Sequence, residues 1–213
     1  MRIGLSKPSI VQAALDVLDA EGMDGVTVRA VARRLGVQAP ALYWHVKNKQ
    51  ELLDEMGTEI WRRVGRKMLA LDSNISLHDR LTGFATIVRD ALLSHRDGAK
   101  AFTGTYLTDA DVLQRQESMF ARMIDAGFSL EDTVRGYSLL YSFTVGFCVE
   151  EQAVASVRPG DDRYSPARRS ERLDADRYPL VVASGRYFLG DADERFTDLV
   201  NVIVQSIERM RTA

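Results

Sequence analysis

Apolar residues recur at helical spacing along almost the whole chain. The first apolar stripe predicts a helix that begins after Ser6, a residue type that caps helices, and ends at Gly22. A second, shorter stripe lies between Thr27 and Gly36 and predicts a helix over Val28–Leu35. No stretch of useful length alternates apolar and polar residues as a half-buried strand does. The pattern therefore predicts an all-α fold.

Capping signals predict where the later helices begin. Asn48 with Glu51 three residues on forms a capping box, and Ser76 is a further cap. The same cap-plus-acid signal opens helices expected over residues 109–126 (Thr108 and Asp111) and 130–156 (Ser129 and Asp132). Residues 158–177 are expected to form a charged loop, and a last helix is expected over residues 192–211. The helix after Asn48 is expected to link a small domain, residues 1–67, to a larger one, residues 68–213.

Two of these helices carry more apolar surface than one chain can bury. Residues 136–149 hold no charge on any face, and the helix over 192–211 has a stripe wide enough for a core and a second surface. Pairing both helices with their twofold copies in a four-helix bundle would bury the surplus. The sequence therefore predicts a homodimer through residues 130–156 and 192–211.

Charge and cysteine content narrow the class of protein. Residues 1–67 carry 11 Lys and Arg against 8 Asp and Glu, whereas residues 68–213 carry 17 against 22. The amino-terminal third is thus the better candidate for a surface that faces phosphates. A single cysteine, Cys148, fits a reducing compartment. No uncharged run reaches the ~20 residues that span a bilayer, so we expect a cytoplasmic protein with no membrane partner.

The segment VQAPALYWHVKNK, residues 37–49, follows the second helix after a tight turn. Two short helices joined by a glycine-containing turn form a helix-turn-helix, whose second helix lies in the DNA major groove. Small side chains at the start of this second helix contact thymine methyl groups, and polar side chains reach phosphates. An arginine can donate two hydrogen bonds to the edge of a guanine. The residues expected to face DNA in these ways are Ala39, Pro40, Ala41, Tyr43, His45, Lys49, Thr27 and Arg29.

The stretch TVRAVARRLGVQAPALYWHVKNKQELLD resembles the DNA-binding domain of the tetracycline-repressor (TetR) family. The likeness continues in LLSHRDGAK (92–100), GFSLE (127–131) and FTVGFCVEEQ (143–152), so it covers most of the chain. It implies a helix-turn-helix domain followed by a helical ligand-binding and dimerisation domain. It also implies a ligand-responsive repressor that an effector releases from palindromic double-stranded DNA. The resemblance adds Trp44 to the residues expected to face DNA, while Ala39 and Ala41 replace polar residues of the tetracycline repressors.

The resemblance also bears on the effector. Tetracycline repressors bind their drug as a magnesium chelate through a histidine, and this sequence has Phe102 at that position. A benzyl group has no lone pair for Mg²⁺, although Glu150 keeps a carboxylate of the family's site. We expect no metal and no cofactor, and a cavity for a flat, largely apolar or aromatic molecule. Its expected lining is Phe84, Val88, Phe102, Thr105, Tyr106, Leu107, Met119, Val134, Tyr137 and Glu150.

Other interpretations of these residues stay open at this stage. Tyr43 and Trp44 also suit a small-domain core, and the arginines at positions 29, 33 and 34 also suit a solvated helix face. Apolar residues of the expected cavity also suit an ordinary helical core. His95 favours a hydrogen-bonding turn over a catalyst, because no nucleophile partner is identifiable.

Two other classes of function compete with a regulator, although we expect that the chain is not an enzyme. A small all-α enzyme would need an acid or base with a perturbed pKa beside an aromatic substrate, and Glu150 is the only carboxylate expected there. A ligand-free architectural DNA-binding protein would need a filled rather than hollow large domain.

Overall fold

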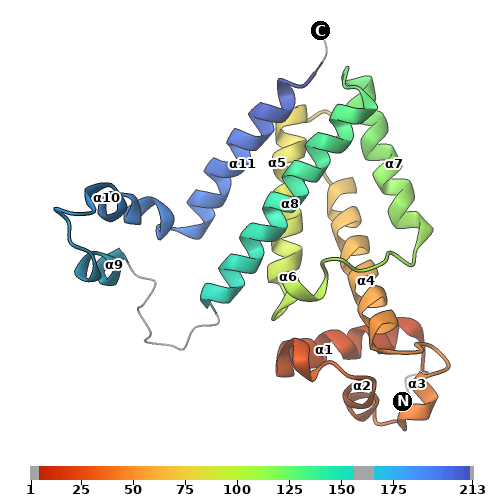
Figure 1. The fold of residues 1–213 in the computed structure, drawn as a ribbon. Helices are drawn as coiled ribbons and strands as arrows, with labels where there is room; N and C mark the ends of the chain where they lie inside the picture. Colours follow the sequence, from red (N-terminus) through yellow and green to blue (C-terminus); the bar gives the residue numbers. More distant parts are fainter. Residues whose placement is uncertain (1–4, 156–165, 212–213) are drawn as a thin grey trace.

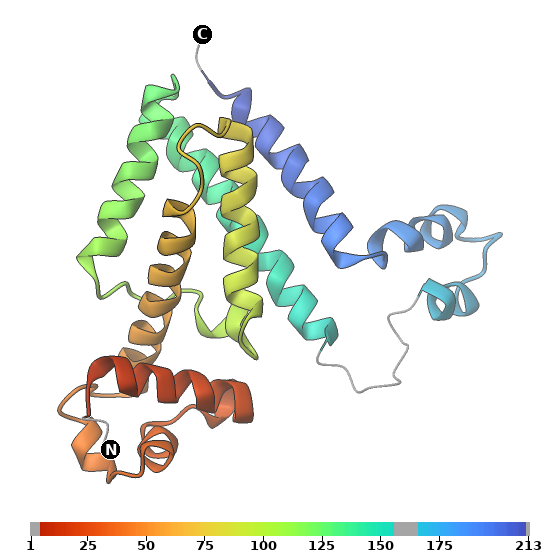
Figure 2. The same cartoon turned by 180° about the vertical axis from the view of Figure 1, so that it is seen from behind.

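The computed structural model describes residues 5–155 and 166–211, and all regular structure in these residues is helical (Figure 1). The predicted all-α fold is confirmed. A small three-helix head lies beneath a larger helical body, and a long helix runs from the head into the body (Figures 1 and 2). None of the helices within the described residues combines the length and apolar character needed to cross a bilayer.

The head consists of α1 (Lys7–Gly25), α2 (Val28–Leu35) and α3 (Ala39–Leu42). Ser6 caps α1 as predicted, because its side chain accepts a hydrogen bond from the Ser9 N–H. The prediction that α1 ends at Gly22 was only partly right. Gly22 breaks the regular helix with a φ of 75°, a value that favours glycine, yet helical residues continue to Gly25. The sequence alone does not show whether a glycine interrupts a helix or ends it.

Helix α4 (Lys49–Leu69) joins head and body. The Asn48 side chain accepts a hydrogen bond from the Glu51 N–H at 2.9 Å, which is the predicted cap. The first half of α4 packs on α1, and the second half packs on α5 and α7 of the body. A single rigid helix therefore touches both parts of the molecule.

The body is built on α5 (Leu77–Leu93), which packs against α4, α8 (Leu130–Ala155) and α11 (Ala192–Glu208). Helix α7 (Ala110–Asp125) covers the side of α8 next to α4, and the short α6 (Gly98–Ala101) lies between α5 and α8. The prediction that Thr108 caps α7 was wrong: Asp109 is the cap, and its side chain accepts from the Asp111 N–H at 2.9 Å.

An arm projects from the body between α8 and α11 (Figures 1 and 2). Residues 158–165 of the expected charged loop lie outside the described residues. Beyond them the prediction of a loop was wrong, because residues 166–172 form α9 (Pro166–Arg172). Helix α10 (Pro179–Phe188) follows and was not predicted. It carries the exposed apolar side chains Leu180, Val181, Tyr187 and Phe188.

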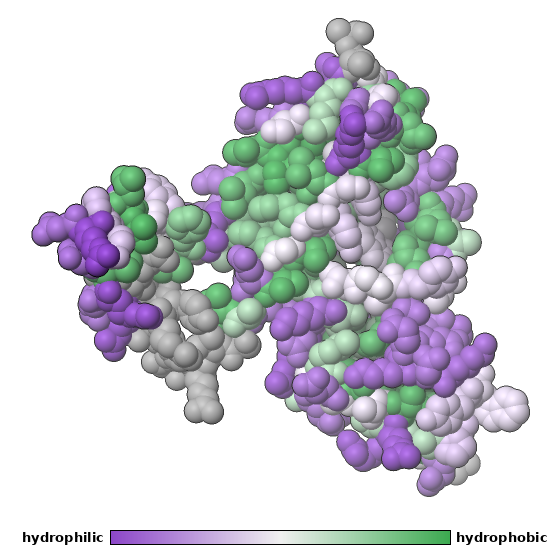
Figure 3. All heavy atoms as spheres, in the orientation of Figure 1, coloured by the Kyte–Doolittle hydropathy of each residue, from purple (hydrophilic) through white to green (hydrophobic). Residues whose placement is uncertain are grey.

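Helices α8 and α11 run side by side and present a broad apolar surface, which is green in Figure 3. The two helices carry large apolar side chains that are at least two-fifths exposed, namely Val134 and Leu139 on α8 and Leu199 and Val202 on α11. A broad, exposed apolar surface is typical of a region that another protein covers.

Candidate DNA-binding surface and effector cavity

The two helices α2 and α3 of the head form the helix-turn-helix. The Thr27 hydroxyl accepts from the Ala30 N–H at 3.1 Å and begins α2, and Gly36, with a φ of 68°, ends it. Pro40 lies in the first turn of α3. Leu42 and Val46 are buried in the head and fix the second helix against the first. The two helices of the helix-turn-helix are thus held in place by the buried core of the head.

The residues expected to face DNA gather on this pair of helices. Tyr43 is 51% exposed and Trp44 is 90% exposed, so neither ring belongs to the core of the head. The others are exposed (Thr27, Arg29, Pro40, Lys49) or half-buried (Ala39, Ala41, His45). Lys49 is partly engaged, because its ammonium donates to the Met23 carbonyl at 3.3 Å.

The three arginines of α2 have different partners. Arg33 lies 3.4 Å from the Glu21 carboxylate, and Arg34 lies 3.2 Å from that of Asp16. Arg29 makes no ion pair or hydrogen bond with its side chain in the described residues 5–155 and 166–211. The solvated-face interpretation therefore fits Arg33 and Arg34, whereas Arg29 keeps its donors free.

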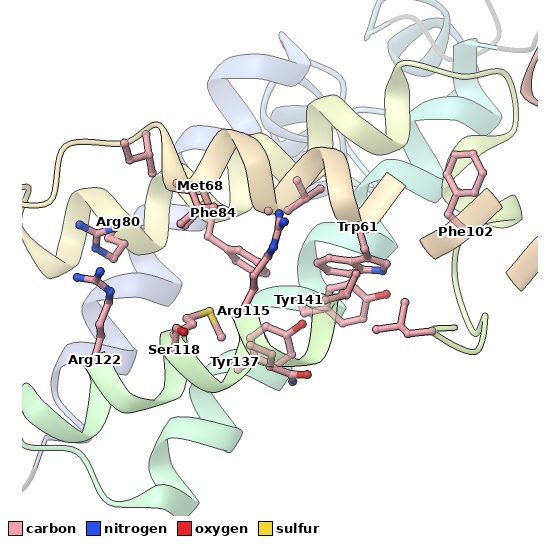
Figure 4. A pocket seen from close by; sticks show the side chains of 18 of the residues that line it. Trp61, Met68, Arg80, Phe84, Phe102, Arg115, Ser118, Arg122, Tyr137 and Tyr141 are labelled. Carbon is pink, nitrogen blue, oxygen red and sulfur yellow. The ribbon is translucent and has the colours of Figure 1, made fainter. Parts of the chain in front are cut away.

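A cavity of about 440 Å³ lies in the body and is lined by α4, α5, α7, α8 and the segment between α6 and α7 (Figure 4). This volume is within the range of small-molecule sites. Six of the expected lining residues do line it: Phe84, Phe102, Thr105, Leu107, Met119 and Tyr137. The sequence analysis missed other lining residues: Trp61, Val64 and Met68 on α4, Arg80 on α5, Arg115 and Arg122 on α7, and Tyr141 on α8.

Four expected lining residues lie elsewhere, which corrects the prediction. Val88 is one turn beyond Phe84 and is buried in the core. Val134 is about two turns before Tyr141, beyond the part of α8 that lines the cavity, and is 43% exposed. Glu150 is about two and a half turns after Tyr141, on the opposite face of α8, and it is exposed.

The fourth misplaced residue is Tyr106, which is 76% exposed. It lies in the extended segment before α7, where successive side chains point in opposite directions. Thr105 and Leu107 face the cavity, and Tyr106 therefore points away from it.

Aromatic rings form one side of the cavity. Tyr137 and Tyr141 stack with ring centroids 6.0 Å apart and an interplanar angle of 4°. Trp61 lies 5.7 Å from Tyr141, and Phe84 lies 5.6 Å from Tyr137, both tilted. Burial raises the pKa of Tyr137 to about 12 and raises that of Tyr141 as well. Both hydroxyls therefore stay neutral and can donate hydrogen bonds at neutral pH.

The segment between α6 and α7 ties the cavity wall to α4. The Tyr106 N–H donates to the Asp54 carboxylate at 3.0 Å, and the Thr108 N–H donates to the Thr58 hydroxyl at 3.0 Å. Arg62 forms an ion pair with Asp109 at 2.5 Å. Because Trp61 and Val64 of α4 also line the cavity, a molecule bound there would touch this helix directly.

A second connection joins the body to the head at His95, between α5 and α6. Its Nδ1 lies 2.9 Å from the Asp19 carboxylate on α1, and its Nε2 lies 3.2 Å from the Arg63 guanidinium. A guanidinium only donates, so Nε2 accepts and Nδ1 carries the proton. The ring also meets Phe102 of the cavity edge-on, at a centroid distance of 5.9 Å. His95 thus has the hydrogen-bonding role that its sequence context favours.

Comparison with known proteins identifies the family. The model for the C-terminal domain of tetracycline-repressor-like proteins matches residues 72–211, and the model for bacterial regulatory proteins of the tetR family matches residues 10–56. The chain belongs to the TetR family. Members of this family are ligand-responsive DNA-binding transcriptional repressors.

Three TetR-family relatives illustrate the likeness. An uncharacterised HTH-type transcriptional regulator of Mycobacterium tuberculosis is 48% identical over 209 residues, which is 98% of this chain and 84% of that protein. A possible TetR-family regulator of Streptomyces coelicolor is similar in structure with a TM-score of 0.83 and 30% identity, covering 97% and 100% of the chains. TetR of class A, solved with 5a,6-anhydrotetracycline and magnesium, has a TM-score of 0.71 and 29% identity, covering 96% and 99%.

The cavity of this TetR-family chain differs from a metal site in its donor atoms. The described residues hold no group of three or more His, Cys, Asp or Glu side chains that could bind a metal ion. Phe102, at the position of the family's histidine ligand, lines the cavity and supplies no metal-binding atom. Glu150, the one carboxylate of the expected site, lies outside the cavity. The residues present therefore do not fit a magnesium chelate.

The single thiol is buried in α8. Cys148 has no exposed surface, and burial raises the pKa of its thiol to about 12. We expect iodoacetamide at about pH 8 to leave Cys148 of the folded protein unmodified, while the chain unfolded in guanidinium is alkylated readily, as measured by mass spectrometry. Rapid alkylation of the folded protein would instead reveal an accessible nucleophile and favour the enzyme interpretation.

Proposed function

We propose that the protein is a homodimeric repressor that leaves a palindromic operator when an aromatic effector occupies the cavity. The observation that carries this proposal is the direct connection of the cavity to α4, the helix that holds the DNA-reading head. A ligand-free architectural protein would have a filled body, and the cavity argues against it. An enzyme would need an acid or base poised near neutral pH, and the cavity lining holds no Asp, Glu, His or Cys in the described part of the chain. Its two tyrosines, Tyr137 and Tyr141, have pKa values that burial raises further away from neutral pH, which disfavours them in this role. As a DNA-binding regulator, the protein would act in the cytoplasm.

The reading head is proposed to insert α3 into the major groove. Ala39, Pro40 and Ala41 at its front are small enough to let the helix approach thymine methyls. Tyr43, Trp44 and His45, which follow α3, and Lys49 at the start of α4 would reach the phosphate backbone. The Thr27 hydroxyl at the start of α2 would do the same. The unpaired Arg29 is the proposed reader of a guanine edge.

The proposed dimer forms through α8 and α11. Their exposed apolar side chains form one continuous surface, and a twofold copy of the same two helices would complete a four-helix bundle. Two heads held in this way would read half-sites ~34–36 Å apart, about one turn of DNA.

The proposed switch is a change in the distance between the heads. An effector that contacts Trp61 and Val64 would push on α4 inside the body, while Asp54 and Thr58 on the same helix hold the segment that closes the cavity. Any shift of α4 displaces the head, so the distance between the two heads of the dimer no longer matches the spacing of the DNA half-sites. A coupling of ~1–3 kcal/mol between the two sites is typical of such regulators.

The test of the proposed function begins with selection of bound fragments from random DNA by the purified protein. A palindromic consensus with half-sites about one turn apart is expected. Planar aromatic compounds are then screened for loss of binding to that consensus. Monomeric protein with no sequence preference at moderate salt would overturn the proposal, and enzymatic change of a bound aromatic compound would favour the alternative.

We expect Arg29→Ala to weaken consensus binding by ~1–3 kcal/mol and to relax specificity at one base position in each half-site. The reason is that its guanidinium has no protein partner in the described residues and is free for bidentate contact with guanine. Repeating the DNA selection with the variant measures both effects. Arg33→Ala is the matched control, because its guanidinium is paired with Glu21 and should leave the consensus unchanged. An unchanged consensus and affinity for Arg29→Ala would remove Arg29 from the reading surface.

A further inference from the structure

The cavity is positively charged. Three arginines line it, Arg80 on α5 and Arg115 and Arg122 on α7, and none of the described residues that line it is an Asp or a Glu. Arg80 and Arg122 lie at the same end of the cavity, and Trp61 and Tyr141 lie toward the other (Figure 4). A molecule that fills the cavity would thus meet flat rings at one end and guanidinium groups at the other.

These arginines lack the carboxylate partners that other arginines of the body have. Arg62, Arg63 and Arg89 each lie within 3.2 Å of a carboxylate oxygen. Arg80, by contrast, donates to the carbonyl oxygens of Asp72 and Ser73 at 3.0 and 3.3 Å. Carbonyl oxygens carry no net charge, so the charge of Arg80 is not neutralised.

In the described residues, the side chains of the two arginines of α7 form fewer hydrogen bonds than that of Arg80. Among the residues that the structure describes, the Arg115 side chain donates only to the Arg62 carbonyl, at 3.5 Å. The nearby Asp109 carboxylate is already bound to Arg62. The side chain of Arg122 forms no hydrogen bond or ion pair within residues 5–155 and 166–211. Guanidinium groups that line a cavity without a counter-charge attract an anion, and their planar donors match a carboxylate.

The aromatic end offers complementary hydrogen-bond donors. The hydroxyls of Tyr137 and Tyr141 have no hydrogen-bond partner in the described part of the chain. Their raised pKa keeps them protonated, so they offer donors to oxygen acceptors on a ring system. The arginines and the two tyrosine hydroxyls therefore favour a ligand with several acceptor oxygens.

We propose that the effector is an aromatic acid, whose planar rings lie against Trp61 and Tyr141. Its anionic oxygens bind Arg115 midway along the cavity and Arg122 at the far end, where Arg80 adds charge. This inference rests on the proposed function and names the chemical class of its ligand. It replaces the largely apolar molecule expected from sequence with one that carries a negative charge.

The test uses matched pairs of planar compounds that differ only in charge, such as 9,10-anthraquinone-2-carboxylic acid with its carboxamide and 2-naphthoic acid with 2-naphthamide. Binding is measured by calorimetry on the full-length protein. We expect acids of the panel to bind at least ~10-fold more tightly than their amides, because a hydrogen-bonded charge pair inside a cavity contributes that much. Amides that bind as tightly as the acids, or a panel in which no acid binds, would overturn the inference.

Charge-removing variants locate the contact. Arg115→Gln and Arg122→Gln are expected to lower the affinity for the acids by ~10-fold or more and to leave that for the amides within about threefold. Arg66→Gln on α4 is the matched control, since this arginine is paired with Glu59 and does not line the cavity. Equal weakening of acid and amide by the two variants would mean that the arginines only shape the cavity, and the inference fails.

Operator release is measured in parallel, which separates this inference from the proposed function. Acids that bind through the arginines without releasing operator DNA would support the inference and contradict the repressor mechanism. Release caused by neutral amides alone would support the mechanism and contradict the inference.

Discussion

We expect Leu199→Glu to convert the dimer into monomers and to lower operator affinity by ~100-fold or more. Leu199 is 42% exposed on the apolar surface of α8 and α11, where a twofold copy would place a second carboxylate in the same buried bundle. A monomer binds only one half-site and therefore lacks the additional affinity that arises when two linked heads bind two half-sites. Analytical ultracentrifugation measures the assembly, and titration of consensus DNA measures the affinity.

The matched control for this prediction is Leu113→Glu. Leu113 is 52% exposed on α7, which packs on α8 and α4 but belongs to no part of the proposed bundle. The control is expected to stay dimeric and to bind the operator normally. A dimeric Leu199→Glu protein would place the interface between copies elsewhere, and the exposed apolar side chains of α10 would then be the next candidate.

Local signals made the reading head predictable from sequence. Thr27 caps α2 and Gly36 ends it through interactions within a few residues, and such signals need no knowledge of the rest of the fold. Helix α6 shows the opposite case. Its first residues follow Asp97, which has a φ of 55° and whose carboxylate accepts from the Met23 N–H at 3.0 Å, 74 positions away in sequence. Contacts with residues on α1 and α8, which are distant in sequence, and with the neighbouring α5 therefore give this short helix its place.

The candidate cavity was predictable in part, for a different reason. Its aromatic members Phe84, Phe102 and Tyr137 follow from apolar spacing and from the resemblance to the tetracycline repressors. The arginines at positions 80, 115 and 122 were missed because the same residue on a helix usually faces solvent. Within the described residues these arginines form no ion pair with a carboxylate, which distinguishes them from the paired arginines. This difference depends on how α5 and α7 pack and leaves no local mark in the sequence.

We expect Phe102→Ala to lower the free energy of unfolding by ~3–5 kcal/mol and to change the effector response, while the folded protein keeps its operator affinity. Phe102 is 2% exposed, so truncation leaves a hole in the body, and that hole enlarges the effector cavity. The head does not touch this ring directly, so its DNA contacts should survive. Denaturant titration measures stability, and DNA binding with and without a releasing aromatic compound measures the response.

Phe128→Ala is the control that distinguishes a role of Phe102 in effector sensing from a role in packing alone. Phe128 is 4% exposed between α7 and α8 and does not line the cavity, so its truncation should cost similar stability and leave the effector concentration for half-release unchanged. Phe102 also meets His95 edge-on, and His95 is bonded to Asp19 of the head. If Phe102→Ala lowers operator affinity as much as effector response, the ring supports the joint between head and body and does not sense the ligand.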